Sequence, residues 1–212
     1  MSVISKQHSQ IARIAITGIC TALYFVLSMW ATIPIANDMA RITFAPLVLI
    51  VLGALYGPAD AAIAGCLGQF FKQMLSPYGI TATTPLWTVP DLIRGLFIGL
   101  VAWIVFKKGR YIELRRVLFI VTCVISSLLT TVLNTIVMGL DGVVIYKYYP
   151  DWPYVLALVP LRLAIGVATA IVLCIVSIPV LGALRRAGFG WTLPERKQPD
   201  DGDEEPAEDP LE

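Results

Sequence analysis

Residues 41–72 read RITFAPLVLIVLGALYGPADAAIAGCLGQFFK, a largely apolar segment that Gly57 and Pro58 interrupt. A proline inside a helix removes a backbone hydrogen bond, and its ring clashes with the preceding turn. We therefore expect two short helices, over about 43–57 and 59–75, joined by a tight turn. The number of membrane crossings of the whole chain depends on this break.

The composition of the chain is that of a membrane protein. Of its 212 residues, 57% are hydrophobic and 15% are charged, and the mean hydropathy is +0.76. Four more apolar stretches come near or above the roughly 20 residues that a helix needs to cross a bilayer core. They cover residues 11–34, 90–106, 117–138 and 154–184. With the two short helices, they predict an all-α membrane protein, a compact bundle of six transmembrane helices.

Six crossings divide the basic residues unevenly between the two sides of the membrane. One side receives nine of them: Lys6, Arg13, Lys107, Lys108, Arg110, Arg115, Arg116, Arg185 and Arg186. The other side receives five: Arg41, Lys72, Arg94, Lys147 and Arg162. Cytoplasmic loops carry the excess of lysine and arginine, so we expect both termini to be cytoplasmic.

The chain divides into three parts. Residues 1–10 form a cytoplasmic N-terminal segment, and residues 11–186 form the transmembrane domain. Residues 187–212 form a tail, and its last part, 195–212, holds nine of the fifteen acidic residues of the chain. This composition is typical of disordered segments. We expect the tail to be disordered and cytoplasmic.

Several classes of function lack their characteristic residues. The sequence has no G-x-x-x-x-G-K-S/T phosphate loop and no H-E-x-x-H zinc motif, and its one histidine, His8, lies in the polar N-terminal segment. The four cysteines lie inside expected helices without metal-ligand or redox spacing. We therefore expect no catalytic residues, no metal, no cofactor on this chain and no nucleic-acid partner.

Three arginines lie on the side that should be poor in positive charge. Asp91 and Arg94 share one face near the start of a helix that we expect to begin at Pro90. Arg162 lies about 12 Å inside the last helix if that helix starts at Tyr154, a depth at which a cation faces a cavity or a partner. Arg41 precedes the second span.

Each of these arginines has two interpretations. The structural alternative gives each arginine an ordinary role. Arg94 would pair with Asp91 at the headgroups, Arg162 would pair with Asp91 inside the membrane, and Arg41 would be a loop cation. The functional alternative is a binding site, because guanidinium groups bind carboxylate or phosphate in a bidentate manner. It predicts a small anionic ligand.

Other polar and small residues admit similar alternatives. Trp87 and Tyr146 belong either to an interfacial aromatic belt or to the wall of a ring-binding pocket. Asn134 either bonds to a ligand or bridges helices. Gly18 and Ala22, four residues apart on the first helix, either pack inside this chain or accept a helix of another subunit.

Taken in order along six helices, these features resemble the S component of energy-coupling factor (ECF) transporters, a vitamin-import branch of the ABC systems. The resemblance covers nearly all of residues 11–186 and rests on the Gly18 and Ala22 face, RITFAPLVLIVLGALYGP at 41–58, Pro90 with Gly95, and LNT at 133–135. The stretches RITFAPLVLIVLGALYGP and LNT look most like those of the folate-type members.

The resemblance implies a vitamin-binding subunit in the bacterial plasma membrane. The small face of its first helix would contact a transmembrane coupling subunit, which is joined to two ATPase subunits that use the ATP. Many members carry an acid at the place that Gln69 takes here, after Gly65. The vitamin would bind from the outside.

We expect Arg41, Arg94 and Arg162 to hold the anionic end of a vitamin, with Asp91 holding Arg94 in place. Trp87 and Tyr146 would cover its ring. Asn134 would orient the ring. Folate is the first expectation, and pantothenate, riboflavin and biotin are alternatives. Two other classes stay open: a membrane enzyme that acts on a lipid phosphate, and an assembly subunit that binds no small molecule.

Overall fold

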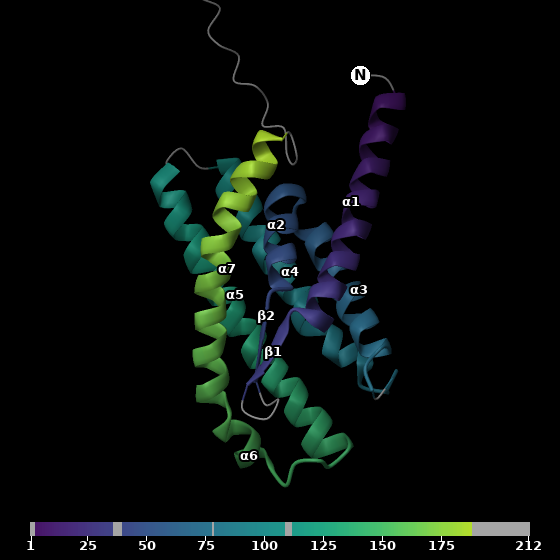
Figure 1. Ribbon diagram of the computed structural model, residues 1–212, viewed down its shortest axis with the longest axis vertical. Helices are drawn as coiled ribbons and strands as arrows, with labels where there is room; N and C mark the ends of the chain where they lie inside the picture. Colours follow the sequence, from purple (N-terminus) through teal and green to yellow (C-terminus); the bar gives the residue numbers. More distant parts are fainter. Residues whose placement is uncertain (1–2, 36–39, 78, 109–111, 188–212) are drawn as a thin grey trace, which may run out of the picture.

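The computed structural model describes residues 3–35, 40–77, 79–108 and 112–187 of the chain. Helices dominate it, which confirms the predicted all-α class (Figure 1). The elements are α1 (Val3–Trp30), β1 (Thr32–Ile35), β2 (Ala40–Thr43), α2 (Pro46–Tyr56), α3 (Pro58–Met74), α4 (Thr84–Lys108), α5 (Ile112–Gly139), the π-helix η1 (Leu140–Ile145), α6 (Trp152–Ala157) and α7 (Val159–Arg186). The predicted disordered tail, apart from Ala187, lies outside the described residues.

The break at Gly57 and Pro58 is present. Helix α2 ends at Tyr56, and α3 begins at Pro58, which occupies the first helical position. Gly57 between them has φ 103°, a backbone conformation that favours glycine because a side chain would be strained there. The two short helices predicted over 43–57 and 59–75 are therefore confirmed, with their ends shifted by one to three residues.

The predicted start of the fourth helix is wrong. Helix α4 begins at Thr84, and Pro90 lies inside it. The connection before it favours this earlier start, because the Thr81 backbone N–H donates to Thr84 Oγ1 at 2.9 Å and the Leu86 N–H donates to the Thr83 carbonyl at 2.9 Å. Asp91 therefore lies beyond the first turn. The helix dipole acts mainly within the first and last turns of a helix, so it does not stabilise Asp91.

Two more boundaries differ from expectation. The first helix ends at Trp30 instead of residue 34, and the chain then forms an antiparallel hairpin in which Thr32 pairs with Thr43 and Pro34 with Arg41. The last helix is interrupted after Ala157. Arg162 consequently lies in the first turn of α7, and not two turns inside one continuous helix.

The bundle has two distinct ends. Figure 1 shows the start of α1 and the end of α7 at one end of the molecule. At the other end lie α6, the end of β1 and the start of β2, and we call it the hairpin end. Within the described chain, three helical stretches are long and apolar enough to cross a membrane: Gln10–Trp30, Val117–Ile145 and Trp152–Leu184. Helix α2 is a shorter apolar helix. Six crossings with cytoplasmic termini stay a prediction.

Glycines bring α3 and α4 into close contact. A Cβ atom at Gly95 would collide with the Ala61 carbonyl, and one at Gly99 would collide with the Pro58 backbone. At Gly65 a Cβ would come within 2.7 Å of the Asp91 carbonyl oxygen. This packing fixes the depth of α4 against α3 and places the polar face of α4 next to that of α3.

Candidate functional site

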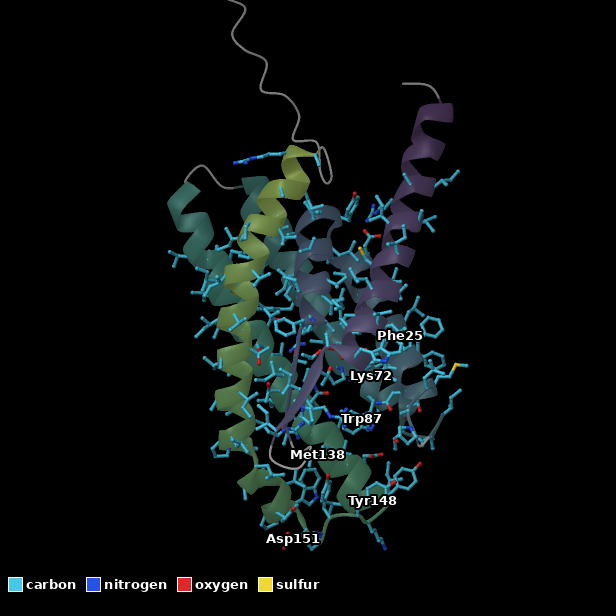
Figure 2. All side chains as sticks on the ribbon, in the orientation of Figure 1. Phe25, Lys72, Trp87, Met138, Tyr148 and Asp151 are labelled. Carbon is cyan, nitrogen blue, oxygen red and sulfur yellow. The ribbon has the colours of Figure 1, made fainter. Side chains whose placement is uncertain are left out.

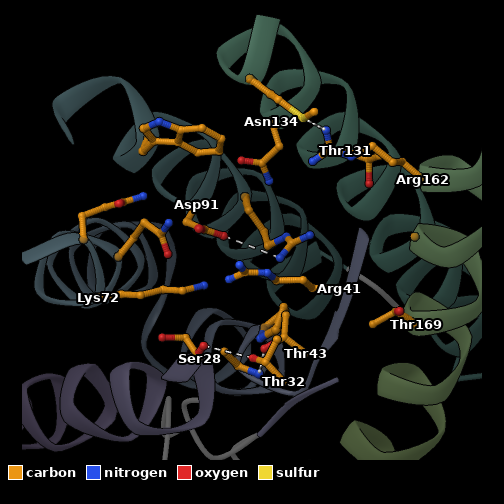
Figure 3. A pocket seen from close by; sticks show the side chains of 18 of the residues that line it. Ser28, Thr32, Arg41, Thr43, Lys72, Asp91, Thr131, Asn134, Arg162 and Thr169 are labelled. Atoms are coloured by element: carbon orange, nitrogen blue, oxygen red, sulfur yellow. Dashed lines mark hydrogen bonds and ion pairs between the residues drawn. The ribbon is translucent and has the colours of Figure 1, made fainter. Parts of the chain in front are cut away.

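A cavity of about 950 Å³ lies between the helices. Its volume is near the upper end of the range of about 300–1,000 Å³ that is usual for small-molecule sites. All seven residues predicted to contact a ligand line it: Arg41, Trp87, Asp91, Arg94, Asn134, Tyr146 and Arg162. Figure 3 shows Arg41, Lys72, Asp91, Asn134 and Arg162 around this space. Sequence positions far apart thus converge on one site.

Asp91 and Arg94 form the centre of the site. Arg94 Nη1 lies 3.6 Å from Asp91 Oδ1, and Arg94 Nε donates to Thr130 Oγ1 at 3.0 Å. Thr130 in turn donates to the Ser126 carbonyl of α5 at 2.7 Å. The side chain of Arg94 is only 13% exposed and that of Asp91 only 9%, so this ion pair lies inside the bundle and not at its surface. The structure therefore contains both the Asp91–Arg94 ion pair of the structural alternative and a cavity, which the functional alternative requires.

Arg162 does not pair with Asp91. Its Nη1 atom instead donates to the Met138 sulfur at 2.7 Å, a contact drawn in Figure 3. A thioether is a weak acceptor, so this contact leaves most of the hydrogen-bonding capacity of the guanidinium for other partners. Arg162 thus offers a cation at a second place on the cavity wall.

The remaining predicted residues come from three elements. Arg41 lies on β2, opposite Pro34 in the hairpin. Trp87 lies one helical turn before Asp91 on α4, and Asn134 lies one turn after Thr130 on α5. Tyr146 follows η1 and stacks on Tyr148, with ring centroids 5.4 Å apart and planes inclined by 4°. Figure 2 shows Trp87 between the helices and Tyr148 at the hairpin end.

Several lining residues were not predicted from the sequence. Helix α3 contributes Gln69, Lys72 and Gln73, of which Gln69 is 7% exposed. Polar residues three and four positions apart on an otherwise apolar helix are the signal that would have identified this face. Asp141 of η1 also lines the cavity.

The charge of the cavity wall is positive. Four basic residues line it, Arg41, Lys72, Arg94 and Arg162, against two acidic ones, Asp91 and Asp141. Among the described buried side chains, two atoms lack a hydrogen-bond partner, Ser126 Oγ and Asp141 Oδ1, and both residues line this cavity. The described part of the chain has no group of three His, Cys, Asp or Glu residues placed to hold a metal ion.

Gly18 and Ala22 lie outside the cavity. Both are exposed on α1, and a Cβ at Gly18 would have no atom within 4 Å. The opposite face of α1 is buried and carries Thr17, Thr21 and Tyr24. Within the described part of the chain the small residues are therefore exposed, and their face of α1 is open there to another molecule.

A helical bundle with membrane-length apolar helices and a cavity lined by basic and aromatic residues suits a solute-binding membrane protein. Residues 8–186 match the family described as ECF-type riboflavin transporter, S component. The chain belongs to this family. It is therefore a transporter subunit of the vitamin-binding kind, and the alternatives of a lipid-phosphate enzyme and of an assembly subunit are set aside.

One solved structure shares the fold of this chain, and two curated proteins are similar to it in sequence. A solved S component of a bacterial ECF transporter has the same fold, with a TM-score of 0.59 and 18% sequence identity, over 84% of this chain and 98% of that one. A UPF0397 protein of Leuconostoc citreum is 26% identical over 67% of this chain and 73% of its own length. One of Lactiplantibacillus plantarum is 31% identical over 45% of this chain, and the match spans half of that relative.

Proposed function

We propose that this S component captures an anionic, water-soluble vitamin in the cavity and that the vitamin is folate. The observation that carries the proposal is the excess of basic over acidic residues on the cavity wall, four against two. Cations in a membrane domain are costly unless an anion or water compensates them. One of the two acids, Asp91, is already engaged by Arg94. Arg162 donates to the weak sulfur acceptor of Met138, so a ligand carboxylate compensates its charge better.

The residues divide into three roles. Arg41, Arg94 and Arg162 bind the anionic groups together with Lys72, and Asp91 and Thr130 fix the position of Arg94. Trp87 and Tyr146 cover a flat ring, because aromatic walls stack on such rings. Asn134, beside the ring, donates and accepts hydrogen bonds through its amide.

Riboflavin is the second candidate. The description of the family names riboflavin, and its flat ring suits the same aromatic side chains. Riboflavin carries no negative charge, so Arg162 would have to be satisfied by water and by the hydroxyl groups of riboflavin. Pantothenate and biotin each carry one carboxylate and are the further alternatives.

Energy for import comes from another molecule in this proposal. S components associate with an energy-coupling module, and we place its contact on the exposed face of α1 around Gly18 and Ala22. ATP is used by ATPase subunits of that module and not by this chain. The hairpin end faces the outside of the bacterial plasma membrane, and both termini are cytoplasmic.

The experiment that tests the proposal identifies the ligand directly. The full chain is purified alone in detergent, denatured, and the released small molecules are identified by mass spectrometry. Binding of folate, riboflavin, pantothenate and biotin to ligand-free protein is then measured by calorimetry. We expect stoichiometric folate and an affinity for it above that for the other three.

Two variants link the binding to the cavity. Arg41→Gln removes one cation of the wall and should weaken folate binding tenfold or more. Lys147→Gln is the matched control, since Lys147 is an exposed cation of the same end that is absent from the cavity wall. Riboflavin in place of folate would transfer the assignment to riboflavin. A folded protein that binds none of the four vitamins would refute the proposal.

A further inference from the structure

The hairpin end of the cavity carries two unsatisfied groups of opposite charge. Asp141 Oδ1 is buried without a hydrogen-bond partner. Arg162, on α7, makes its hydrogen bond to the weak sulfur acceptor of Met138. Met138 precedes Asp141 by three residues, so Arg162 contacts a residue about one helical turn from Asp141. Both charged residues line the cavity.

These two groups do not satisfy each other. The ion pairs found among the described residues join Arg13 to Asp60 and Arg94 to Asp91, and none joins Arg162 to Asp141. A buried carboxylate oxygen without a donor costs free energy, and native structures keep such atoms for a ligand, an ion or water. The position is also held by an unusual backbone, because Asp141 is the second residue of the π-helix η1. Such helices are frequent at functional sites.

The surrounding aromatic residues fix this corner. The Tyr149 ring packs on Gly142, where a Cβ would collide with it, and the Tyr149 N–H donates to the Gly142 carbonyl at 3.0 Å. Tyr149 also stacks on Tyr154, with ring centroids 5.6 Å apart. The chain after η1 therefore folds back on Gly142. Asp141 is held at the cavity wall by its neighbours.

We propose that Asp141 and Arg162 form a specificity subsite for the N-acyl amino acid end of the ligand, in which an amide N–H lies beside a carboxylate. Asp141 Oδ1 accepts the amide N–H, and the Arg162 guanidinium binds the carboxylate. A ligand with the anion alone would be repelled by Asp141, and one with the donor alone would leave Arg162 unpaired. This inference rests on the proposed function and narrows its ligands. Folate and pantothenate present such an end, whereas riboflavin and biotin do not.

The test compares folate with pteroate, which has the same ring system but lacks the glutamyl amide and its carboxylates. Dissociation constants for both are measured by calorimetry with the full chain in detergent. We expect Asp141→Ala and Arg162→Gln to lower the preference of the wild type for folate over pteroate tenfold or more, because each removes a hydrogen bond to a charged group. Asp151→Ser is the matched control. It removes an acid at the same end, outside the cavity wall, and serine keeps the helix cap that Asp151 provides for α6.

Each outcome decides a different point. If Asp141→Ala keeps the wild-type ratio of folate to pteroate affinity, or weakens both ligands equally, the subsite is refuted while the proposed function stands. If the wild type does not bind folate, both fail. If Asp141→Ala does not yield folded protein, Asp141→Asn replaces it. Its neutral acceptor should lower the ratio by a smaller factor, and an unchanged ratio would again refute the subsite.

Discussion

At the scale of single residues, the site depends on how Arg94 is held. Its two partners lie on different helices: Asp91 on its own helix α4, and Thr130 on α5. A hydrogen bond to a charged group stabilises by about 1.5–3 kcal/mol. The orientation of Arg94 in the cavity therefore depends on the contact between α4 and α5 as much as on its own sequence neighbours.

Thr130→Val should lower both stability and affinity. We expect the free energy of unfolding to fall by about 1.5–3 kcal/mol, because Arg94 Nε loses its acceptor in a buried place. Folate binding should weaken about tenfold, because the Arg94 guanidinium is no longer held in its orientation by Thr130. The measurements are thermal unfolding in detergent and calorimetry. Thr122→Val is the control, since the Thr122 hydroxyl is also buried but donates only to the Leu118 carbonyl of its own helix, at 2.7 Å.

At the scale of elements, an ion-pair cluster joins α1 to the turn between α2 and α3. Arg13 Nε donates to Asp60 Oδ2 at 2.8 Å, and Arg13 Nη2 donates to the Tyr56 carbonyl at 3.2 Å. Thr17 Oγ1 donates to Asp60 Oδ1 at 3.1 Å. One acid on α3 thus receives donors from two successive turns of α1, beside the exposed small-residue face of that helix.

Arg13→Gln should destabilise the protein by about 1–2 kcal/mol, less than a fully buried pair would, because the Arg13 side chain is 47% exposed. Combined with Asp60→Asn, the loss should be smaller than the sum of the two single losses, because the residues share one interaction. A double-mutant cycle in chemical unfolding measures this. Arg186→Gln, at an exposed position at the end of α7, is the control. If the two losses in unfolding free energy are additive, Arg13 and Asp60 have no interaction free energy and the prediction is wrong.

The close contact of α3 with α4 leads to another prediction at this scale. Gly95→Ala should destabilise by about 1–3 kcal/mol, because the added methyl group collides with the Ala61 backbone and the helices must separate. It should also weaken ligand binding, since Asp91 and Arg94 move with α4. Gly182→Ala on α7 has open space and should stabilise by about 0.5–1 kcal/mol instead. Unfolding midpoints of the two variants would check the difference in sign.

At the scale of the whole molecule, the proposed ligand site and the proposed docking face occupy different surfaces. The cavity lies inside the bundle, whereas Gly18 and Ala22 are exposed on the far face of α1. Ala22→Leu should leave the affinity of the isolated chain for folate unchanged within about twofold. It should strongly reduce co-purification with the coupling module and uptake by cells, because a large side chain prevents close helix approach.

Ala168→Leu is the matched control for this variant. Ala168 is also exposed on a long apolar helix, α7, but lies on another side of the bundle from the α1 face. We expect it to retain co-purification and uptake. Equal behaviour of the two leucine variants would refute docking at Ala22.

The sequence by itself determined the class of the molecule and singled out seven residues that line the cavity. Long apolar stretches can be stable only in lipid, and charged residues within them are too costly to lie there without a partner. For this reason Asp91, Arg94 and Arg162 could be singled out one by one, and the Gly57–Pro58 break followed from local backbone chemistry.

Only the tertiary structure decided how these residues are arranged. The pairing of Arg94 with Asp91 and Thr130, the place of Arg162 beside Met138, and the contribution of Gln69, Lys72 and Asp141 depend on contacts between residues far apart in the chain. Helix boundaries such as the start of α4 at Thr84 depend on hydrogen bonds in the connecting loop. Local propensity and hydropathy carry no information about such contacts, because they result from helix packing over the whole bundle.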